Sequence, residues 1–446
     1  MTEFIPPYPP RYKEWPNPLD IIKFARQDLL SFWPSKAFQV QFTGMTILTK
    51  GFFLANCPDA AHHVLTQYGH KNPLMRKALA PLLGDVFDSD EETWYKPDSN
   101  QSDLFNPELV SLHNETITNA TENYIWRWGS LTSAETIKVL PEMRNLTAEI
   151  SCKLLFNKKL SVEKSREMLG IFSQYQDAVE KMDISLFLGL PGWLPKFGGN
   201  PITKAAKEVH KITDDFIAQG TKNDNQDTVL SHLLTVRDGS HPNGLTATQL
   251  RNELSMLFMA GQETMANTLS WAWYLISQSP DVEKKLHEEL DCVLGERSAT
   301  LDDLDKLIFT RAVIDETLRL YPPIPLLSRE ATGYDVIRNR EVPAGSIMLV
   351  VPWLLHRHEK FWHKPNHFMP ERFLEGTRPH KFAFLPFSGM PSECSAQFFG
   401  TVVATLSLAT LAKNFRLALP EGQVVSHECH LTLRPKNDLP MLITKR

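Results

Sequence analysis

Long apolar segments are missing from this sequence. A membrane-spanning helix needs about 20 consecutive apolar residues, and no uncharged run of that length occurs. The most apolar stretch, residues 254–276, contains Glu263 and several polar side chains, so we interpret it as a buried core helix. Residues 1–10 also lack the charged and then apolar order of a signal peptide. These absences predict a cytoplasmic protein with no membrane anchor.

Cysteine is scarce and widely spaced. The five cysteines stand at positions 57, 152, 292, 394 and 429, which is an odd number at irregular intervals. Small secreted proteins held by disulfides usually carry an even number of cysteines. The pattern therefore argues against a disulfide framework and fits a reducing compartment.

Nucleotide-binding loops and strong charge are absent as well. The sequence has no glycine-rich phosphate loop and no dinucleotide fingerprint, so we expect no fused reductase domain. The net charge of −5 gives no reason to expect nucleic acid or an anionic membrane as a partner. Any redox chemistry would then take its electrons from a separate protein.

What the sequence does contain is mostly helical periodicity. Residues 1–20 form a proline-rich arm, which we expect to be extended because proline disfavours helix around it. Residues 21–446 are predicted to form a single domain, mainly α with a small β subdomain. The predicted helices span residues 58–68, 107–128, 141–156, 162–182, 204–219, 247–277, 280–294, 301–320 and 396–414. The predicted strands span residues 38–48, 51–54 and 347–351, and the tail segments 430–434 and 440–444 could pair with each other.

Cys394 lies in a loop just ahead of the last predicted helix. The loop and its flanks read Phe384-Leu-Pro-Phe-Ser-Gly-Met-Pro-Ser-Glu-Cys-Ser-Ala396. A thiolate at a helix N-terminus is stabilised by the helix dipole, which favours its use as a soft metal ligand. Cys394 is therefore the candidate metal ligand of this chain.

Three further motifs precede Cys394 in a fixed order. Ala260-Gly-Gln-Glu-Thr264 lies midway along the predicted helix 247–277, Glu316-Thr-Leu-Arg319 near the end of another helix, and Pro370-Glu-Arg-Phe373 in a loop. Alone, a Glu-x-x-Arg motif is a weak signal, since many helices carry such a surface pair. Together and in this order, the motifs resemble the cytochrome P-450 (haem-thiolate monooxygenase) family, soluble type, over nearly the whole chain. The resemblance implies the cytochrome P-450 fold and haem b bound through the Cys394 thiolate.

The resemblance assigns a structural role to three charged residues. Glu316 and Arg319 are one helical turn apart on the same face. In the family, this pair joins a further arginine, here Arg372, in a buried ionic triad behind the haem. Removing one partner of such a triad leaves an unpaired buried charge and costs roughly 3–5 kcal/mol. We expect the triad to support the fold and to take no part in catalysis.

Glu263 and Thr264 match the acid–alcohol pair of the family. There, the pair organises water for proton delivery to dioxygen, while the thiolate on the other side donates electron density to the iron. Gly261 would allow the helix to distort, because no Cβ crowds the turn. The alternative is that Gly261 and Thr264 only permit close helix packing. With the other motifs present, we predict catalytic roles for Glu263 and Thr264.

The residues that would retain haem match the family only in part. The resemblance assigns Trp94 and Arg329 to the propionates and Phe387 to the ligand loop. Where the family has two further arginines, this chain has Asp98 and Ser392. Propionates are carboxylates that need cationic or donor partners, so both replacements weaken haem retention. Lys96, Arg357 and His358 are candidates to compensate for them.

Three more departures surround Cys394. Met390 and Ala396 replace glycines that let the loop pass close to the porphyrin. Methionine at a position that needs a positive φ costs on the order of 1 kcal/mol. Glu393 places a like charge beside the thiolate, which should raise the pKa of the thiol.

Two functions follow from these residues. The first is a haem-thiolate monooxygenase that inserts one oxygen atom into a hydrophobic small molecule, with electrons from a separate ferredoxin or reductase. The second is a haem-poor protein of the same fold that binds a small molecule or assists another enzyme, as Asp98 and Ser392 suggest. A third, a haem-thiolate isomerase or lyase, is disfavoured by the intact Glu263–Thr264 pair. We take the monooxygenase as the prediction.

The substrate itself is not encoded in a motif. Residues 86–101 and 184–197 are expected to line its pocket, and their apolar character suits a hydrophobic molecule. The loop 189–197 is explained equally well as a segment folded onto its own core. A histidine cluster at positions 356, 358, 363 and 367 has no metal-ligand spacing, so we expect no metal site there.

Overall fold

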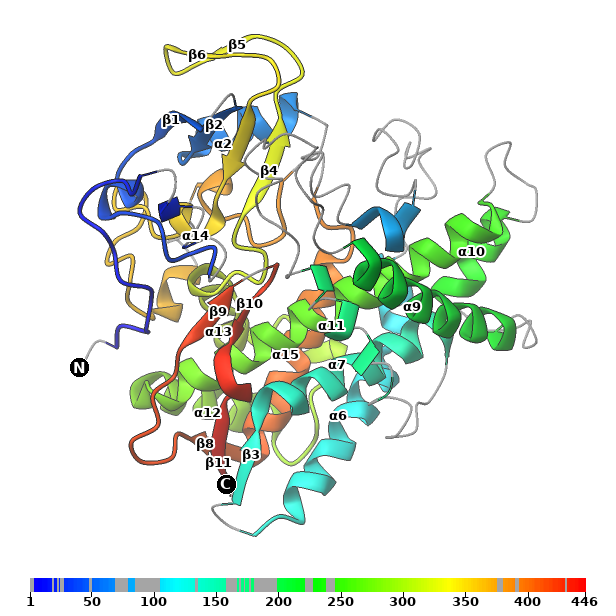
Figure 1. Cartoon of the computed structure of the whole chain (residues 1–446). Helices are drawn as coiled ribbons and strands as arrows, with labels where there is room; N and C mark the ends of the chain where they lie inside the picture. Colours follow the sequence, from blue (N-terminus) through cyan, green and yellow to red (C-terminus); the bar gives the residue numbers. More distant parts are fainter. Residues whose placement is uncertain are drawn as a thin grey trace.

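The computed structural model of the chain has a large helical part and a smaller part built around a mixed β-sheet (Figure 1). This confirms the predicted fold class, mainly α with a small β subdomain. The predicted helix 162–182 lies largely, and the loop 189–197 wholly, outside the residues that the structure describes. These are residues 4–17, 20–21, 24, 28–47, 50–68, 79–84, 105–132, 135–157, 167, 170–171, 173–175, 178–179, 199–220, 228–237, 245–374, 380–389, 393–429 and 431–446.

The helical part is built around α11 (Ala247–Ser277), a helix of 31 residues. A capping box begins it: Thr246 Oγ1 accepts the N–H of Gln249 at 3.2 Å, and Gln249 Oε1 accepts the N–H of Thr246 at 2.8 Å. Helices α7, α9, α13 and α15 pack against α11. The other α-helices of the described residues are α2 (Pro58–Gln67), α5 (Pro107–Leu112), α6 (Asn114–Gly129), α7 (Val139–Phe156), α9 (Gly199–Gly220), α10 (Val229–Arg237), α12 (Pro280–Leu294), α13 (Ile308–Leu320), α14 (Pro352–Leu355) and α15 (Gln397–Asn414).

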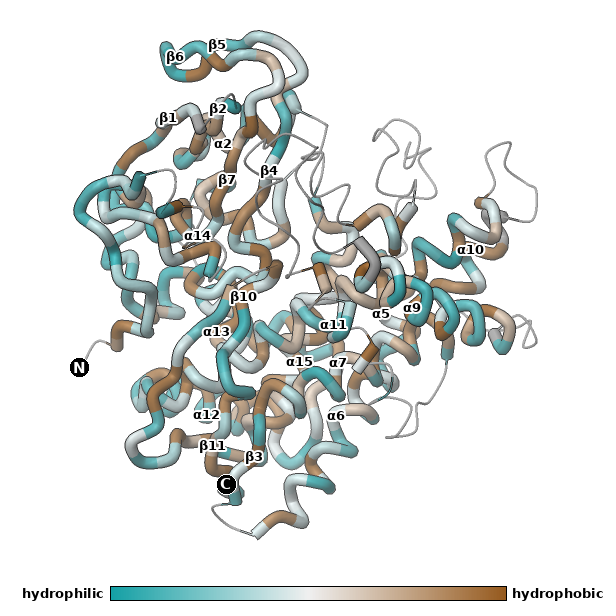
Figure 2. The backbone as a smooth tube through the Cα atoms, in the orientation of Figure 1, coloured by the Kyte–Doolittle hydropathy of each residue, from teal (hydrophilic) through white to brown (hydrophobic). Residues whose placement is uncertain are grey.

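Apolar patterning explains where two of these helices lie. α15 is apolar all round and is buried from Thr401 to Ala412 between α6, α11 and α13. α9 is amphipathic, with buried residues every three or four positions, and it shows alternating hydrophilic and hydrophobic bands in Figure 2. Within the described part of the chain, no helix is both long and apolar enough to cross a bilayer.

The main sheet has the strand order β1-β2-β7-β4. β1 (Phe42–Ile47) and β2 (Lys50–Ala55) form an antiparallel hairpin, in which Gly44 lies opposite Phe53. A Cβ at Gly44 would lie 2.5 Å from the Phe53 ring, so any larger residue there would force the ring to move. β2 pairs in parallel with β7 (Ile347–Val350), and β7 pairs antiparallel with β4 (Leu327–Glu330). β7 is a central strand whose residues are all apolar, as expected for a strand covered on both faces.

The two tail segments were predicted to pair with each other, and this prediction was wrong. β10 (Leu433–Pro435) pairs with β9 (His427–Cys429). β11 (Pro440–Lys445) instead lies between β3 (Glu135–Lys138) and β8 (Phe415–Ala418). The turn η7 (Lys436–Asp438) separates the two tail segments, and its Asn437 and Asp438 have positive φ. A further hairpin, β5 (Asp335–Ile337) with β6 (Arg340–Val342), extends from the sheet side in Figure 1.

Two of the predicted helices are shorter or divided in the structure, and one helix was not predicted. The helix expected over residues 107–128 is divided at His113 into α5 and α6. The helix expected over residues 301–320 is a short 3₁₀ turn, η4 (Leu301–Asp303), followed by α13. α13 begins at Ile308 because the Glu289 carboxylate on α12 accepts the N–H groups of Phe309 and Thr310, at 2.5 and 2.8 Å. α10 was not predicted.

Over residues 4–17 the proline-rich arm has no helix and no strand beyond a single bridge of Tyr12 with Pro34, whereas residue 20 is helical. The arm packs onto the domain. Tyr321 Oη donates a hydrogen bond to the Pro7 carbonyl at 2.8 Å, and the N–H of Phe368 donates to the Phe4 carbonyl at 3.2 Å. The Phe4 ring meets the Tyr274 ring edge-on, with centroids 6.0 Å apart. These contacts tie the arm to the C-terminal ends of α11 and α13.

Candidate functional site

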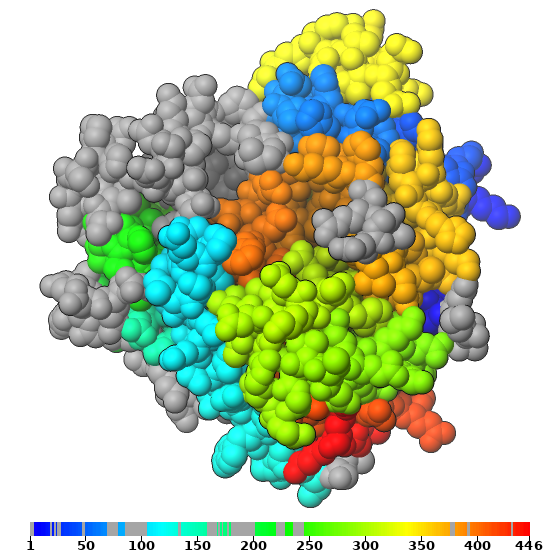
Figure 3. All heavy atoms as spheres, turned by 180° about the vertical axis from the view of Figure 1, so that it is seen from behind, coloured from blue at the N-terminus to red at the C-terminus, as the bar shows by residue number. Residues whose placement is uncertain are grey.

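The loop that carries Cys394 is closed by its own backbone. The N–H of Cys394 donates to the Phe387 carbonyl at 2.9 Å, which brings two residues of the ligand motif together. The Phe387 ring lies near Gly400 on α15, where a Cβ would be 3.9 Å from it. Cys394 is exposed, and the segment that carries it reaches the surface on the face seen in Figure 3. The fold thus presents a thiol at the start of α15.

The same loop packs tightly onto α2. A Cβ on Gly389 would lie 3.1 Å from the Phe382 ring and 3.4 Å from a methyl of Leu65. Ser388, one residue earlier, has a φ of 66°, a left-handed conformation that is uncommon for a residue other than glycine. Glycine at 389 and the strained serine at 388 together set the path of the loop. Met390 and Ser392 lie outside the described residues.

The thiol of Cys394 has a raised pKa. Protein atoms crowd around the sulfur although the residue keeps solvent contact, and this desolvation raises the pKa most. The Glu393 carboxylate raises it further, as predicted, whereas the N–H of Ala396 lowers it. The metal-free thiol therefore keeps its proton at neutral pH, and metal binding would have to release that proton.

α11 is buried along most of its length but opens in the middle. From Met265 to Ile276 every residue is buried, whereas Ala260 is exposed and Thr264 is half-buried. The Oγ1 of Thr264 donates a hydrogen bond to the Ala260 carbonyl at 2.6 Å. An open stretch on a core helix faces a space that another molecule can fill.

Glu263 is buried in the protein interior, unlike its neighbour Thr264. Its carboxylate is buried and accepts hydrogen bonds from Arg144 on α7 and from the Thr432 hydroxyl, both at 3.1 Å. Arg434 on β10 lies 3.8 Å from the same oxygen. The acid of the predicted pair therefore ties α11 to α7 and to the tail, while the alcohol stays on the open stretch.

Gly261 is not required by helix packing. A Cβ at this position would lie 3.4 Å from Ser151 Oγ on α7, which is an ordinary van der Waals contact. The alternative explanation of Gly261, close packing against a neighbouring helix, is therefore not supported by the geometry.

The structure brings the three residues of the predicted ionic triad together. Arg319 donates to both carboxylate oxygens of Glu316 at 2.6 and 2.7 Å, and Arg372 Nε donates at 3.0 Å. The N–H of Met369 adds a further bond to the same carboxylate at 2.8 Å. Glu316 and Arg319 are wholly buried. The triad fixes the chain segment after α14, since Arg319 also donates to the carbonyls of Pro365 and His367.

His356 links this triad to the ligand loop, and the sequence reading missed it. Its Nε2 accepts the N–H of Leu385 at 2.8 Å, so its Nδ1 carries the proton and donates to the Arg319 carbonyl at 3.2 Å. Burial and then the Arg319 charge lower the pKa of His356 to about 3, which keeps the ring neutral. No sequence motif marks this role, because both partners are backbone atoms of distant segments.

The structure describes only some of the residues assigned to the propionates. Arg329 is buried on β4 and donates to the Ser328 carbonyl at 3.0 Å. Of the compensating candidates, Arg357 is buried, with its guanidinium 3.6 Å from the centre of the Trp353 ring, and it donates to the Leu320 carbonyl. It is thus held away from solvent. Trp94, Lys96 and Asp98 lie outside the described residues, as do the expected pocket walls 86–101 and 184–197.

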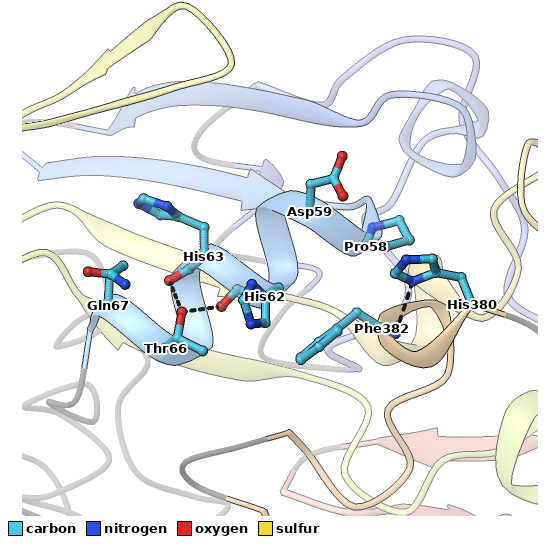
Figure 4. Close-up of a pocket in the computed structure, with 8 residues that line it drawn as sticks. All are labelled: Pro58, Asp59, His62, His63, Thr66, Gln67, His380 and Phe382. Atoms are coloured by element: carbon cyan, nitrogen blue, oxygen red, sulfur yellow. Dashed lines mark hydrogen bonds between the residues drawn. The ribbon is translucent and has the colours of Figure 1, made fainter.

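A separate pocket of about 510 Å³ lies beside α2 (Figure 4). Its lining comes from α2 and from the short segment around η6 (Lys381–Ala383), and includes His62, His63 and His380. No lining residue belongs to α11 or to the loop of Cys394. Across the described part of the chain, no three His, Cys, Asp or Glu side chains gather to hold a metal ion.

The described residues fit a haem. Cys394 offers one soft sulfur donor on an accessible loop, which suits a haem iron with a thiolate ligand. The open stretch of α11 leaves exposed Ala260 and half-buried Thr264 without a full protein cover. Arg329 supplies a buried cation of the kind that a propionate requires.

Comparison with known proteins gives a consistent result. The family model described as Cytochrome P450 matches residues 9–441. Cyclooctatin synthase of Streptomyces melanosporofaciens is 28% identical over 81% of this chain and 79% of its own length. Protein LUTEIN DEFICIENT 5, chloroplastic, of Arabidopsis thaliana is 25% identical over 98% of this chain and 77% of its own length. Cyclooctat-9-en-7-ol 5-monooxygenase of Streptomyces melanosporofaciens is 30% identical over 65% of this chain and 63% of its own length.

Proposed function

Because this chain belongs to the cytochrome P450 family, we propose that it inserts one oxygen atom from dioxygen into a hydrophobic small molecule, with electrons from a separate ferredoxin or reductase. Membership of the family makes it an oxidoreductase of the haem monooxygenase kind. The name of one relative, cyclooctat-9-en-7-ol 5-monooxygenase, suggests an apolar cyclic alcohol as the substrate class.

Each site residue has a role in this proposal. Cys394 would hold the iron of haem b, with Phe387 shaping its loop and Trp94 and Arg329 holding the propionates. Bound in this way, the haem would supply the activation of dioxygen. The Thr264 hydroxyl donates to the Ala260 carbonyl, so its oxygen can accept a hydrogen bond from water on the open side of α11.

Proton supply would then depend on Glu263. Its carboxylate is paired with Arg144 and Thr432, and a proton can pass to water near Thr264 only if this carboxylate exchanges one of those contacts. In this proposal Glu263 supplies the proton from a carboxylate that Arg144 and Thr432 hold in place, and Thr264 positions the water that receives the proton.

One observation supports the proposal more than any other. The loop presents the Cys394 thiol at the surface while its backbone is tied to Phe387, and α11 is open at Thr264. A structural cysteine would more often be buried and inert.

The test is the absorption spectrum of protein purified after expression with haem supplied, recorded oxidised and then reduced under carbon monoxide. The expected result is a red-shifted Soret band typical of thiolate ligation. Cys394→Ser should lose this band, whereas Cys292→Ser, a change at the exposed cysteine of α12, should keep it. A folded protein without any Soret band would contradict the proposal.

The haem-poor binder is the second candidate, and Asp98 and Ser392 are the residues that favour it. If missing cations limit haem retention, Asp98→Arg combined with Ser392→Arg should raise the haem content per chain. Unchanged haem content would contradict that explanation. A stable protein that takes up apolar ligands without haem would favour the binder.

A further inference from the structure

Glu253 is a buried acid that the proposed chemistry does not use. Its side chain is 3% exposed, and its Oε2 has no hydrogen-bond partner. An unpaired polar atom in a protein interior is costly, so its retention calls for an explanation. Desolvation alone raises the pKa of Glu253 to about 8, and no charged group contributes to this shift.

The position of Glu253 on α11 relates it to the site. Residues three, four, seven and eleven positions further along a helix lie on the same face. These positions hold Met256, Leu257, Ala260 and Thr264, which belong to the open stretch of α11. Eleven residues of helix rise about 16 Å, and the side chain leans toward the helix N-terminus, away from Thr264.

The neighbours of Glu253 in sequence behave differently. Asn252 is also buried, but its Nδ2 donates to the Leu83 carbonyl at 3.1 Å. Ser255 is buried and is hydrogen-bonded to Thr213 on α9 at 2.9 Å. Both are satisfied within the protein, whereas the Oε2 of Glu253, on the helix face that leads to Thr264, is not.

We infer that Glu253 recognises a hydroxyl group at the end of the substrate remote from the carbon that is oxidised. The inference rests on the proposed function and deepens it, since it assigns the residue that would recognise the hydroxyl group of an apolar alcohol. Between Glu253 and Thr264, the apolar side chains of Met256 and Leu257 contact the hydrocarbon skeleton. A protonated Glu253 donates a hydrogen bond to the alcohol oxygen and pairs its own Oε2 with the hydroxyl proton.

The first test is stability, which needs no ligand. Glu253→Leu removes a buried, unpaired carboxyl group and should raise the thermal midpoint of the purified protein by on the order of 2 °C. The matched control Asn252→Leu breaks a satisfied buried hydrogen bond and should lower the midpoint. A fall with Glu253→Leu as large as that with Asn252→Leu would show an internal partner and overturn the inference.

The second test is binding, followed by quenching of tryptophan fluorescence. The probes are cyclooctat-9-en-7-ol and other apolar cyclic alcohols, each paired with the hydrocarbon of the same skeleton. We expect wild type to bind at least one alcohol roughly tenfold more tightly than its hydrocarbon. Glu253→Leu should abolish this preference, and Glu253→Gln should keep part of it, because an amide also donates to a hydroxyl.

Several outcomes would overturn the inference: no alcohol preference in wild type, the same preference in Glu253→Leu, or tighter binding of an amine analogue than of the alcohol. The failure of the proposed oxygenase is distinguishable from these. A protein without a Soret band that still discriminates alcohol from hydrocarbon through Glu253 would lose the monooxygenase function and retain the hydroxyl site.

Discussion

At the scale of single residues, substitution of the buried Glu316 carboxylate should strongly destabilise the fold. It is wholly buried and accepts from Arg319, Arg372 and the N–H of Met369. We predict that Glu316→Gln lowers the free energy of unfolding by roughly 3–5 kcal/mol, because two arginines then face a neutral group. The measurement is the urea-unfolding midpoint.

The preceding residue in the sequence provides the control for Glu316→Gln. Asp315 pairs with Arg311 one turn away at 3.0 Å, on the accessible side of α13. Asp315→Asn should cost less than about 1 kcal/mol. Similar losses for the two substitutions would show that the triad adds no more to stability than a surface ion pair does.

His356 should give stability a recognisable dependence on pH. The ring is neutral when folded because its pKa is lowered to about 3, whereas it binds a proton near pH 6.5 when unfolded. Protons therefore favour the unfolded state, so the stabilisation by His356 is present above pH 6.5 and is lost as the pH falls toward 3.

The change that tests this is His356→Leu. At pH 7 it should cost roughly 2–4 kcal/mol, since it leaves the N–H of Leu385 and the carbonyl of Arg319 without their partner. Between pH 7 and pH 4 the difference in the free energy of unfolding between wild type and His356→Leu should shrink by about 3 kcal/mol. Urea unfolding at each pH measures it. A gap that stays constant would mean that the ring titrates alike in both states.

Sequence alone could name the candidate site residues but not their partners. Cys394, Thr264 and the triad stand in short motifs, and their chemistry restricts which residue types can serve. The contacts of Glu263 with Arg144 and Thr432 join residues more than a hundred positions apart, and no local pattern encodes them. Glu253 was overlooked because one acid in an apolar helix carries no motif.

At the scale of elements, the start of α13 depends on a neighbouring helix. The Glu289 carboxylate on α12 accepts the N–H groups of Phe309 and Thr310 and the Thr310 hydroxyl. We predict that Glu289→Ala lowers the free energy of unfolding by about 1–2 kcal/mol, as the loss of a helix cap does. Thermal unfolding measures it.

The control for this cap lies one residue earlier on α12. Glu288 is largely exposed and lies 3.8 Å from Lys284 in an i, i+4 pair. Glu288→Ala should change stability by less than about 0.5 kcal/mol. An equal effect of both substitutions would indicate a general loss of helix propensity or charge in α12.

The elements that matched their predictions carry local signals. α11 has its capping box at Thr246 and Gln249, and α12 starts with proline at Pro280, so both boundaries were predicted as the structure has them. α13 was predicted too long because its start is set by Glu289 on another helix. β3 and β8 were missed, since such short strands are specified by β11 between them and only weakly by their own residues.

At the scale of the whole molecule, the proline-rich arm contacts segments that are far apart in the sequence. Tyr321 Oη reaches the Pro7 carbonyl, and the Arg11 guanidinium lies 3.6 Å from the centre of the Phe38 ring. We predict that deletion of residues 1–11 lowers the thermal midpoint and speeds proteolysis. Tyr321→Phe removes the hydrogen bond alone and should cost about 1 kcal/mol. An unchanged thermal midpoint after the deletion would show that the arm does not stabilise the domain.

The parallel pairing of β2 with β7 has a consequence for the synthesis of the protein on the ribosome. Phe52 pairs with Ile347, so the hairpin of β1 and β2 leaves the ribosome long before its partner strand exists. At synthesis rates of roughly 5–20 residues per second, about 300 further residues take on the order of 15–60 seconds. During that time an apolar strand edge is open to pairing with other chains. Nascent chains halted before residue 347 should therefore bind chaperones or aggregate more readily than those halted after residue 350.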